Sequence, residues 1–231
     1  MTPLFTVITP TGSRPEAFAL CEKWVAQQTL LSHSHSWEWL VADDGQIETP
    51  CTMNQIKIPV QLNNTLVSSQ FSNLTALLKY AKGRYIIVVE DDDYYGPHHF
   101  ANVVFALQDT ELVGERPSRY YNVKLKTFRE FENKRHASLC QTAFRFEVIP
   151  EVLEVCANKS WIDVTLWQSF RRSKQLFESG EVVGIKGMPG RPGISDAHKG
   201  TGTGWRGDPG MDRLRQWIGA NAEVYKKYAH G

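Results

Sequence analysis

The sequence predicts a single α/β domain in which a mainly parallel sheet is flanked by helices. Its first half alternates short apolar runs with amphipathic segments in the order β-α-β-β-α-β-α, as expected where helices connect parallel strands. The most apolar run, Tyr85–Val89, is rich in β-branched residues and indicates a strand buried on both faces. With 231 residues, 42% of them hydrophobic and 22% charged, the chain is long enough to bury a core.

Local signals place the elements of the first half. Pro15 suits a first helical position, Ser72 an N-cap, and Gly83 the end of a helix. We therefore expect strands at residues 4–9, 37–42, 56–62 and 85–90, and helices at residues 15–28, 72–81 and 97–107.

The second half has a different pattern. We expect two long strands that pair, at 119–128 and 138–148, and a further strand at 182–188. Helices are expected at residues 150–156, 163–172 and 211–228, the last one amphipathic. The loop at 189–210 holds seven glycines in twenty-two residues and is predicted to be a lid, the alternative being a disordered loop. The single domain thus divides into a first half, 1–115, and a second half, 116–231.

Charge differs between these halves. Residues 1–115 carry 6 basic and 13 acidic side chains, a net charge of −7, whereas residues 116–231 carry 20 and 12, a net charge of +8. Such asymmetry favours an anionic partner for the second half, although a solvated basic sheet face is the alternative. The four cysteines show no Cys-x-x-Cys spacing, and no apolar stretch is long enough to span a membrane. We expect a cytoplasmic protein with reduced thiols, located in the host cytoplasm if it is viral.

Four consecutive carboxylates, Glu90 to Asp93, follow the apolar run directly. In open α/β sheets, ligands bind outside the carboxyl ends of the strands. Adjacent carboxylates repel one another unless a cation neutralises them. The cluster therefore predicts a divalent metal site with oxygen ligands, the alternative being a solvated acidic turn.

Polar residues also follow the first two strands. The first is followed by Thr9-Pro-Thr-Gly-Ser-Arg-Pro15, which is neither Gly-x-Gly-x-x-Gly nor a Walker loop. The second ends in Asp43-Asp44-Gly45, where paired carboxylates can accept hydrogen bonds from a nucleobase imide or a ribose hydroxyl. Polar groups at three strand ends favour a nucleotide-binding edge.

At this point the chain resembles the nucleotide-sugar glycosyltransferases of the GT-A fold, especially those of family 2. The resemblance covers about the first hundred residues, in the family's order. It rests on Val7-Ile8-Thr9-Pro10-Thr11 with Arg14-Pro15, on Trp39-Leu40-Val41-Ala42-Asp43-Asp44-Gly45, on Asn73, and on Gly83-Arg84-Tyr85-Ile86 leading into Glu90–Asp93. It implies a Rossmann-like donor half and an acceptor half with a glycine-rich lid.

The resemblance also implies roles for single residues. Metal ligation is expected from Asp91, Asp93 and the late His198, with Mn²⁺ or Mg²⁺ as cofactor. The register of the acidic motif is open, because Asp91-x-Asp93 and Glu90-x-Asp92-Asp93 both fit, and Gly12-Ser13 replaces the usual Tyr-Asn. Contacts to the nucleotide-sugar, with a UDP-sugar favoured, are expected from Thr9, Pro10, Thr11, Arg14, Asp43, Asp44, Asp91, Lys199 and Arg206.

Asp163 resembles the family's acidic residue at the start of a helix below the acceptor. It is expected to be the base that takes the acceptor's proton in an inverting transfer, since a helix N-terminus favours an anion. Ile162 stands where the family usually has Glu, and plain N-capping is the alternative.

The basic segment 116–145 indicates an acceptor. Its basic residues alternate with aromatic ones, which is typical of nucleic-acid binding. A hydroxymethylated base in DNA, as modified by some bacteriophage enzymes, is one expected acceptor, and a soluble glycan or polysaccharide is the other. Two further functions remain open: a sugar-phosphate nucleotidyltransferase and a non-catalytic nucleotide- or nucleic-acid-binding module.

Overall fold

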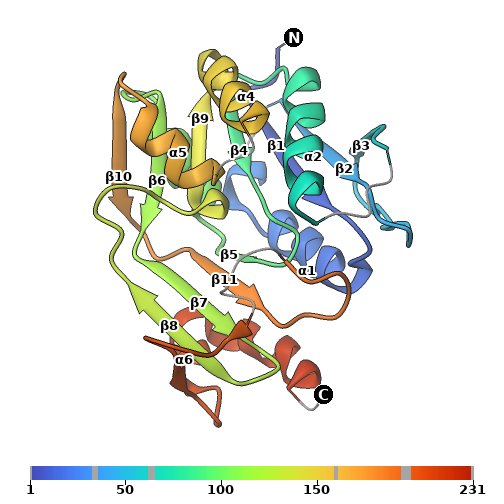
Figure 1. The fold of residues 1–231 in the computed structure, drawn as a ribbon, viewed down its shortest axis with the longest axis vertical. Coiled ribbons are helices and arrows are strands. Elements are labelled where there is room, and N and C mark those ends of the chain that lie inside the picture. The colour runs from blue at the N-terminus through green and yellow to red at the C-terminus, as the bar shows by residue number, and fades with distance from the viewer. Residues whose placement is uncertain (1, 33–35, 62–65, 159–160, 194–198, 230–231) are drawn as a thin grey trace.

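A computed structural model describes residues 2–32, 36–61, 66–158, 161–193 and 199–229, with the side chains of residues 66–68 left aside. Two sheets make up the fold (Figure 1). No helix within these ranges is long and apolar enough to cross a membrane.

The first sheet has seven strands in the order β10-β6-β9-β4-β1-β2-β3. Four of its six pairings are parallel, and only β9 runs antiparallel to its two neighbours, so the predicted mainly parallel sheet is confirmed. The strands are β1 (Phe5–Thr11), β2 (Trp37–Asp43), β3 (Gln55–Ile58), β4 (Tyr85–Val88), β6 (Leu112–Arg116), β9 (Thr142–Arg145) and β10 (Lys174–Glu178).

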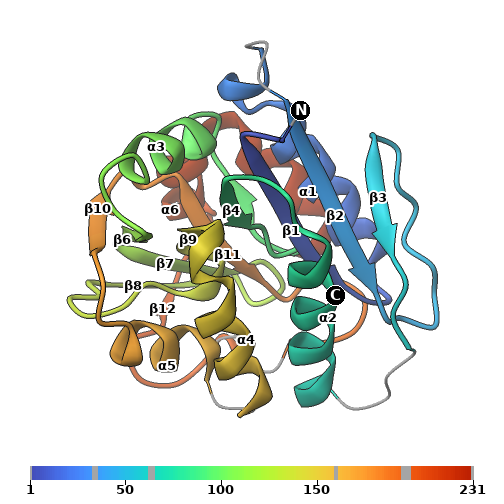
Figure 2. The same ribbon diagram turned by 90° about the horizontal axis from the view of Figure 1, so that it is seen from above.

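Helices cover both faces of this sheet (Figure 2). Alternate side chains of its strands enter two separate cores: Ile87 lies in one, and its neighbours Ile86 and Val88 lie in the other. Burial on both faces explains why β4 reads as a continuous apolar run. One face packs against α2 (Leu66–Tyr80), α4 (Ile149–Ala157) and α5 (Ile162–Ser169), and the other against α1 (Pro15–Ala26) and α3 (His99–Ala106).

A second, five-stranded sheet has the order β12-β8-β7-β11-β5. Its first member along the chain, β5 (Tyr94–Tyr95), directly follows the acidic cluster and pairs with β11 (Val182–Lys186). The acidic cluster therefore lies where the two sheets meet. The remaining members are β7 (Ser118–Asn122), β8 (Thr127–Phe131) and β12 (Arg206–Gly207), and α6 (Asp212–Ile218) packs against this sheet.

The predicted pairing of strands 119–128 and 138–148 is wrong. The first stretch is a hairpin of β7 and β8, with Lys126 in a left-handed conformation at the turn. The second contains only the short β9, which lies between β4 and β6 in the other sheet. The strands β6 and β10 were not expected, because their polar residues and their distance from each other in the chain hide the pairing.

Two predicted helices also differ from the structure. The helix α2 begins at Leu66 rather than at Ser72, so Ser72 lies inside it. The C-terminal helix is interrupted at Gly219, whose positive φ of 59° ends α6. A 3-10 segment, η5 (Gly219–Tyr228), follows and returns Tyr225 to the core, where its hydroxyl accepts a hydrogen bond from Trp24.

The buried Leu214 of α6 gives a test of this packing. Leu214→Ala leaves a cavity against the second sheet, and we expect it to lower the free energy of unfolding by about 2–5 kcal/mol. Gln216→Ala, on the exposed side of the same helix, should change it by less than about 0.5 kcal/mol. Urea unfolding followed by circular dichroism measures both, and equal losses would mean that α6 does not pack as described.

Candidate functional site

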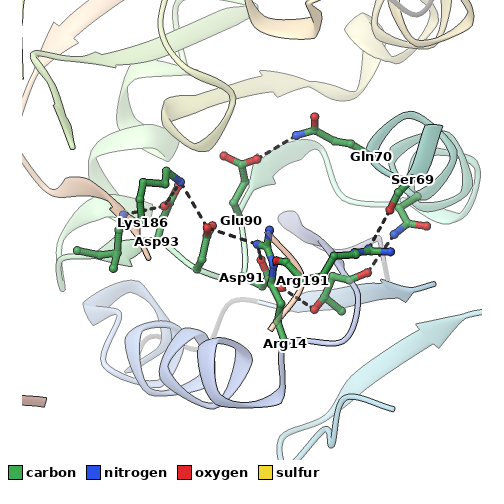
Figure 3. Close-up of polar contacts among 12 residues, drawn as sticks. Arg14, Ser69, Gln70, Glu90, Asp91, Asp93, Lys186 and Arg191 are labelled. Atoms are coloured by element: carbon green, nitrogen blue, oxygen red, sulfur yellow. Dashed lines mark hydrogen bonds and ion pairs between the residues drawn. The ribbon is translucent and has the colours of Figure 1, made fainter. Parts of the chain in front are cut away.

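The acidic cluster at the end of β4 is held from both halves of the chain (Figure 3). Arg14, just before α1, donates to Asp91 at 2.8 Å and lies 3.3 Å from Asp92. The second oxygen of Asp91 accepts a hydrogen bond from the Thr11 hydroxyl at 2.6 Å. These contacts join the predicted nucleotide loop to the predicted metal site.

Asp93 is fully buried and points into the junction of the sheets. Its Oδ1 accepts hydrogen bonds from the Ile185 amide at 2.9 Å and from the Lys186 ammonium at 2.8 Å. Lys186 also lies 3.5 Å from Asp92. Lys186 of β11 is thus the main counter-charge of this side of the cluster (Figure 3).

Glu90 turns toward a different neighbour. Its Oε1 accepts a hydrogen bond from the amide of Gln70 in α2 at 3.0 Å, and its own backbone N–H donates to the hydroxyl of Tyr95 at 2.8 Å. Glu90, Asp93 and the thiol of Cys140 have ligand atoms within 4.8 Å of one another. The structure therefore brings together Glu90 and Asp93, one from each end of the motif.

The electrostatics of the cluster follow from burial. Desolvation, followed by the neighbouring carboxylates, raises the pKa of Glu90 to about 8. Burial is also the largest cause that raises the pKa of Asp93 to about 6, although Lys186 opposes it. The pKa of Asp91 is raised by burial too, with Arg14 acting in the opposite direction. The protein alone does not fully stabilise the ionised cluster.

These residues fit a divalent cation. With all four carboxylates ionised, Arg14 and Lys186 leave a net charge of about −2 among these six groups. The Oδ2 of Asp93 is buried and has no hydrogen-bond partner among the described residues. An orphaned acceptor and an uncompensated double negative charge are what a site for a hard cation requires.

Asp44, at the end of β2, forms the other part of the site. Its Oδ1 accepts a hydrogen bond at 2.5 Å from Arg191, which also donates to the Ser69 hydroxyl at 2.9 Å. Its Oδ2 is buried and has no partner in the described part of the chain. A Cβ on Gly12 would lie 2.0 Å from the Arg191 guanidinium, so glycine at this position makes the room that Arg191 occupies.

Arg191 is also fixed through its backbone. Its carbonyl accepts a hydrogen bond from the Arg14 Nε at 2.6 Å, and its amide donates to the Ser13 carbonyl at 3.3 Å. The start of the predicted lid therefore already lies on the nucleotide loop.

Other predicted nucleotide contacts have structural partners. The buried Thr9 hydroxyl accepts a hydrogen bond from the Trp39 indole, and both carboxylate oxygens of Asp43 accept backbone amides, from Gly45 and Thr49. Asn73 donates to the carbonyls of Thr11 and Ala42 and so ties two strand ends together. Pro10 lies half-buried at the end of β1.

Asp163 lies half-buried in the first turn of α5. The N-cap of this helix is Trp161, so Asp163 is not in the capping position, although it accepts the Val164 amide at 2.8 Å. Burial is the largest influence on its pKa and raises it, with His136 opposing. A carboxylate with a raised pKa is a stronger base, whereas the dipole argument alone predicted the opposite shift.

The remaining predicted residues lie in the loop 189–210. His198 lies outside the described residues, and Lys199 is exposed. Arg206 is in β12, where its guanidinium lies over the Phe128 ring at 5.0 Å. No contact of Arg206 with the acidic cluster occurs among the residues that the structure describes.

Sequence reasoning missed Lys186, Arg191, Ser69 and Gln70. Lys186 stands in an otherwise apolar strand, where a charge is rarely tolerated without a partner, and this signal was available. Arg191 lacked such a signal, because a loop arginine is ordinarily solvated.

Comparisons with known proteins agree with this geometry. A sequence model described as "Glycosyl transferase family 2" matches residues 6–161. Solved structures of S. aureus TarS share the fold. A structure of TarS superposes with a TM-score of 0.55 and 13% sequence identity, and the match covers 78% of this chain and 36% of the TarS chain. A structure of TarS 1–349 in complex with UDP has the same score and identity, and covers 78% of this chain and 60% of that one. The fold is therefore GT-A.

This chain thus spans about a third of the full TarS chain and 60% of the shorter one. No curated protein matches the sequence.

The raised pKa of Glu90 predicts how stability depends on pH. Because the folded state binds the Glu90 proton more tightly than the unfolded state, stability falls as pH rises from 4.5 toward about 8. Without divalent cations, the free energy of unfolding of Glu90→Gln should therefore exceed that of the wild type by about 1–2 kcal/mol at pH 8, and by less at pH 6. Thermal unfolding at both pH values measures this. The exposed, ion-paired Glu48→Gln should show no such dependence, and a pH-independent effect of Glu90→Gln would contradict the prediction.

Proposed function

This chain belongs to glycosyl transferase family 2, and we propose that it transfers a sugar from a nucleoside diphosphate donor, preferably a UDP-sugar, to an acceptor hydroxyl. One observation carries the proposal: three strand ends place Asp44, the Thr11–Arg14 loop and the Glu90–Asp93 cluster in one hydrogen-bonded network. This combination of groups is suited to a nucleobase, a diphosphate and a divalent cation bound side by side.

Asp44 and Arg191 suit a nucleobase with an imide edge. The unpartnered Oδ2 of Asp44 is an acceptor, and the Arg191 guanidinium beside it is a donor. Uracil offers a complementary N–H and carbonyl, and the amino group and N3 of cytosine match the same pair. We favour uridine because UDP is the nucleotide bound in the TarS 1–349 complex, which has the same fold.

Arg14 and the acidic cluster suit the diphosphate. Glu90 and Asp93, with Asp91 or Asp92, would hold Mn²⁺ or Mg²⁺. When bound, the cation neutralises the leaving diphosphate. Arg14, half-buried against Asp91 and Asp92, adds a positive charge on the same side of the site.

Asp163 is the base of the proposed reaction. The acceptor hydroxyl gives its proton to the Asp163 carboxylate while its oxygen forms a bond to the anomeric carbon. The bond from that carbon to the diphosphate oxygen breaks, and the nucleoside diphosphate leaves with the electron pair. Attack opposite to the leaving group inverts the configuration.

The acceptor belongs to one of two classes. A hydroxymethylated base in DNA, of the kind that bacteriophages modify, fits the basic second half, and a soluble glycan is the alternative. A sugar-phosphate nucleotidyltransferase should have a glycine-rich signature directly after the first strand, and the Thr9–Pro15 loop lacks one. A non-catalytic module would bind nucleotide without turning over a donor.

The metal-dependent step is tested through Asp93. Asp93→Asn keeps the size of the side chain but removes a charge, and we expect it to abolish the gain in UDP affinity that Mn²⁺ gives, a change of at least about tenfold. Isothermal titration with and without Mn²⁺ measures this, together with hydrolysis of a panel of nucleotide-sugars by the wild type. The exposed Asp109→Asn is the control. Donor hydrolysis in excess chelator would refute metal dependence, and nucleotide binding without turnover would favour the module.

The role of Asp163 is tested by Asp163→Asn, which cannot accept a proton. We expect kcat to fall by roughly 10²-fold or more, with UDP affinity nearly unchanged. Because burial raises the pKa of Asp163, wild-type activity should decline on acidification at a higher pH than an ordinary Asp would give. A loss of thermal stability with kcat intact would instead assign Asp163 a structural role.

A further inference from the structure

The second sheet presents two stacked aromatic rings beside the acidic cluster. Tyr120 of β7 and Phe131 of β8 lie with their centroids 5.9 Å apart and their planes at 17°. The guanidinium of Arg129 lies 4.9 Å from the centre of the Phe131 ring. All three side chains are half-buried, and no ion pair of Arg129 with a carboxylate occurs in the described parts of the chain.

Strand register puts these residues on one face. Tyr120 is paired with Arg129 across the hairpin, and with Gly184 on its other side. A Cβ on Gly184 would lie 2.4 Å from the Tyr120 ring, so glycine lets this ring lie over β11. Arg119 and Glu130 alternate to the opposite face, where Arg119 pairs with Glu130 and lies over Trp217.

This face adjoins the acidic cluster through Lys186. The Lys186 ammonium contacts Asp93 at 2.8 Å and lies 5.9 Å from the Tyr120 ring. On the other side, the Tyr120 hydroxyl is hydrogen-bonded to Ser138 at 2.5 Å. An acceptor resting on these rings therefore lies next to the acidic cluster that is proposed to hold the leaving diphosphate.

The structure also reduces the basic set expected from the sequence. Arg116 is paired with Glu178, Arg119 with Glu130, and Arg145 donates to the backbone carbonyl of Leu107. The stretch 124–135 around the hairpin retains five basic residues against two acidic ones. Positive charge is thus concentrated beside the stacked rings.

We propose that Tyr120, Phe131 and Arg129 form the floor of the acceptor site and bind a single-stranded stretch of nucleic acid, with a base stacked on Phe131 and a phosphate held by Arg129. This inference rests on the proposed function and specifies its acceptor. Flat rings attract the π-faces of bases, and a guanidinium above a ring attracts phosphate. A polyol phosphate has charge but no face to stack, and a neutral glycan leaves Arg129 unused.

The test is binding of a fluorescein-labelled single-stranded 12-mer oligonucleotide, followed by anisotropy between 20 and 300 mM salt. Phe131→Ala should weaken binding about 5- to 100-fold and leave the salt dependence unchanged, because stacking involves no counterion. Arg129→Gln should weaken binding and lower the slope of log K against log salt by about 0.7, one phosphate contact. Phe131→Leu keeps the volume without the flat ring, and it replaces Phe131→Ala if that variant does not fold.

Arg172→Gln is the matched control, because Arg172 also lies over a phenylalanine, Phe170 at 5.2 Å, but away from this face. It should bind as the wild type does. No oligonucleotide binding at 20 mM salt, unchanged binding by Phe131→Leu, or an equal loss in Arg172→Gln would overturn the proposal. Heparin binding that outcompetes the oligonucleotide and is insensitive to Phe131 would assign the face to an anionic glycan. UDP binding by the wild type is measured in parallel, and its absence would count against the proposed function instead.

Discussion

Four carboxylates follow one another where the two sheets of this protein meet, Asp91 to Asp93 buried and Glu90 half-buried, and their mutual repulsion constrains the structure around them. Two cations from opposite ends of the chain oppose that repulsion, Arg14 from the loop after β1 and Lys186 from β11. Burial makes each of these pairs costly to break, because a lone buried charge loses both water and partner. The cluster therefore fixes how the second sheet docks on the first.

The same constraint shapes the part of the site that is proposed to bind the nucleotide. Arg14 contacts Asp91 through one part of its guanidinium and the Arg191 carbonyl through another, so the segment after β11 is tied to the loop after β1. Arg191 in turn reaches Asp44 and Ser69 through the space that Gly12 leaves open. The side chains at three strand ends that are proposed to bind the nucleotide-sugar are thereby held in place in the absence of ligand. This reduces the conformational entropy that they would lose on binding.

The second sheet gives the proposed donor site an adjoining surface of different character. Its β7–β8 hairpin carries rings and arginines where the first sheet carries carboxylates, and Lys186 contacts both. The family match ends at residue 161, so all of β11, β12 and α6 belong to the part of the chain that this match does not cover. Differences in acceptor within such a fold are expected to arise there, since binding residues concentrate on segments that a rigid scaffold positions.

The sequence by itself determined the strands β1 to β4 of the first sheet, the helices α1 to α3 and the edge at which polar groups gather, but not β6, β10 or the pairing of β9. Strands such as β1, β2 and β4 are buried on both faces, and short-range patterns of apolar residues report that burial directly. The acidic motif and Asp44 were visible for the same reason, since each follows such a strand.

Only the tertiary structure decided the partners of these residues. The hairpin of β7 and β8 was read as one long strand because both of its strands and its turn are rich in polar and aromatic residues. The contacts Arg14–Asp91, Lys186–Asp93 and Arg191–Asp44 join residues 77, 93 and 147 positions apart. Pairings over such distances depend on how the sheets pack, and no local pattern records them.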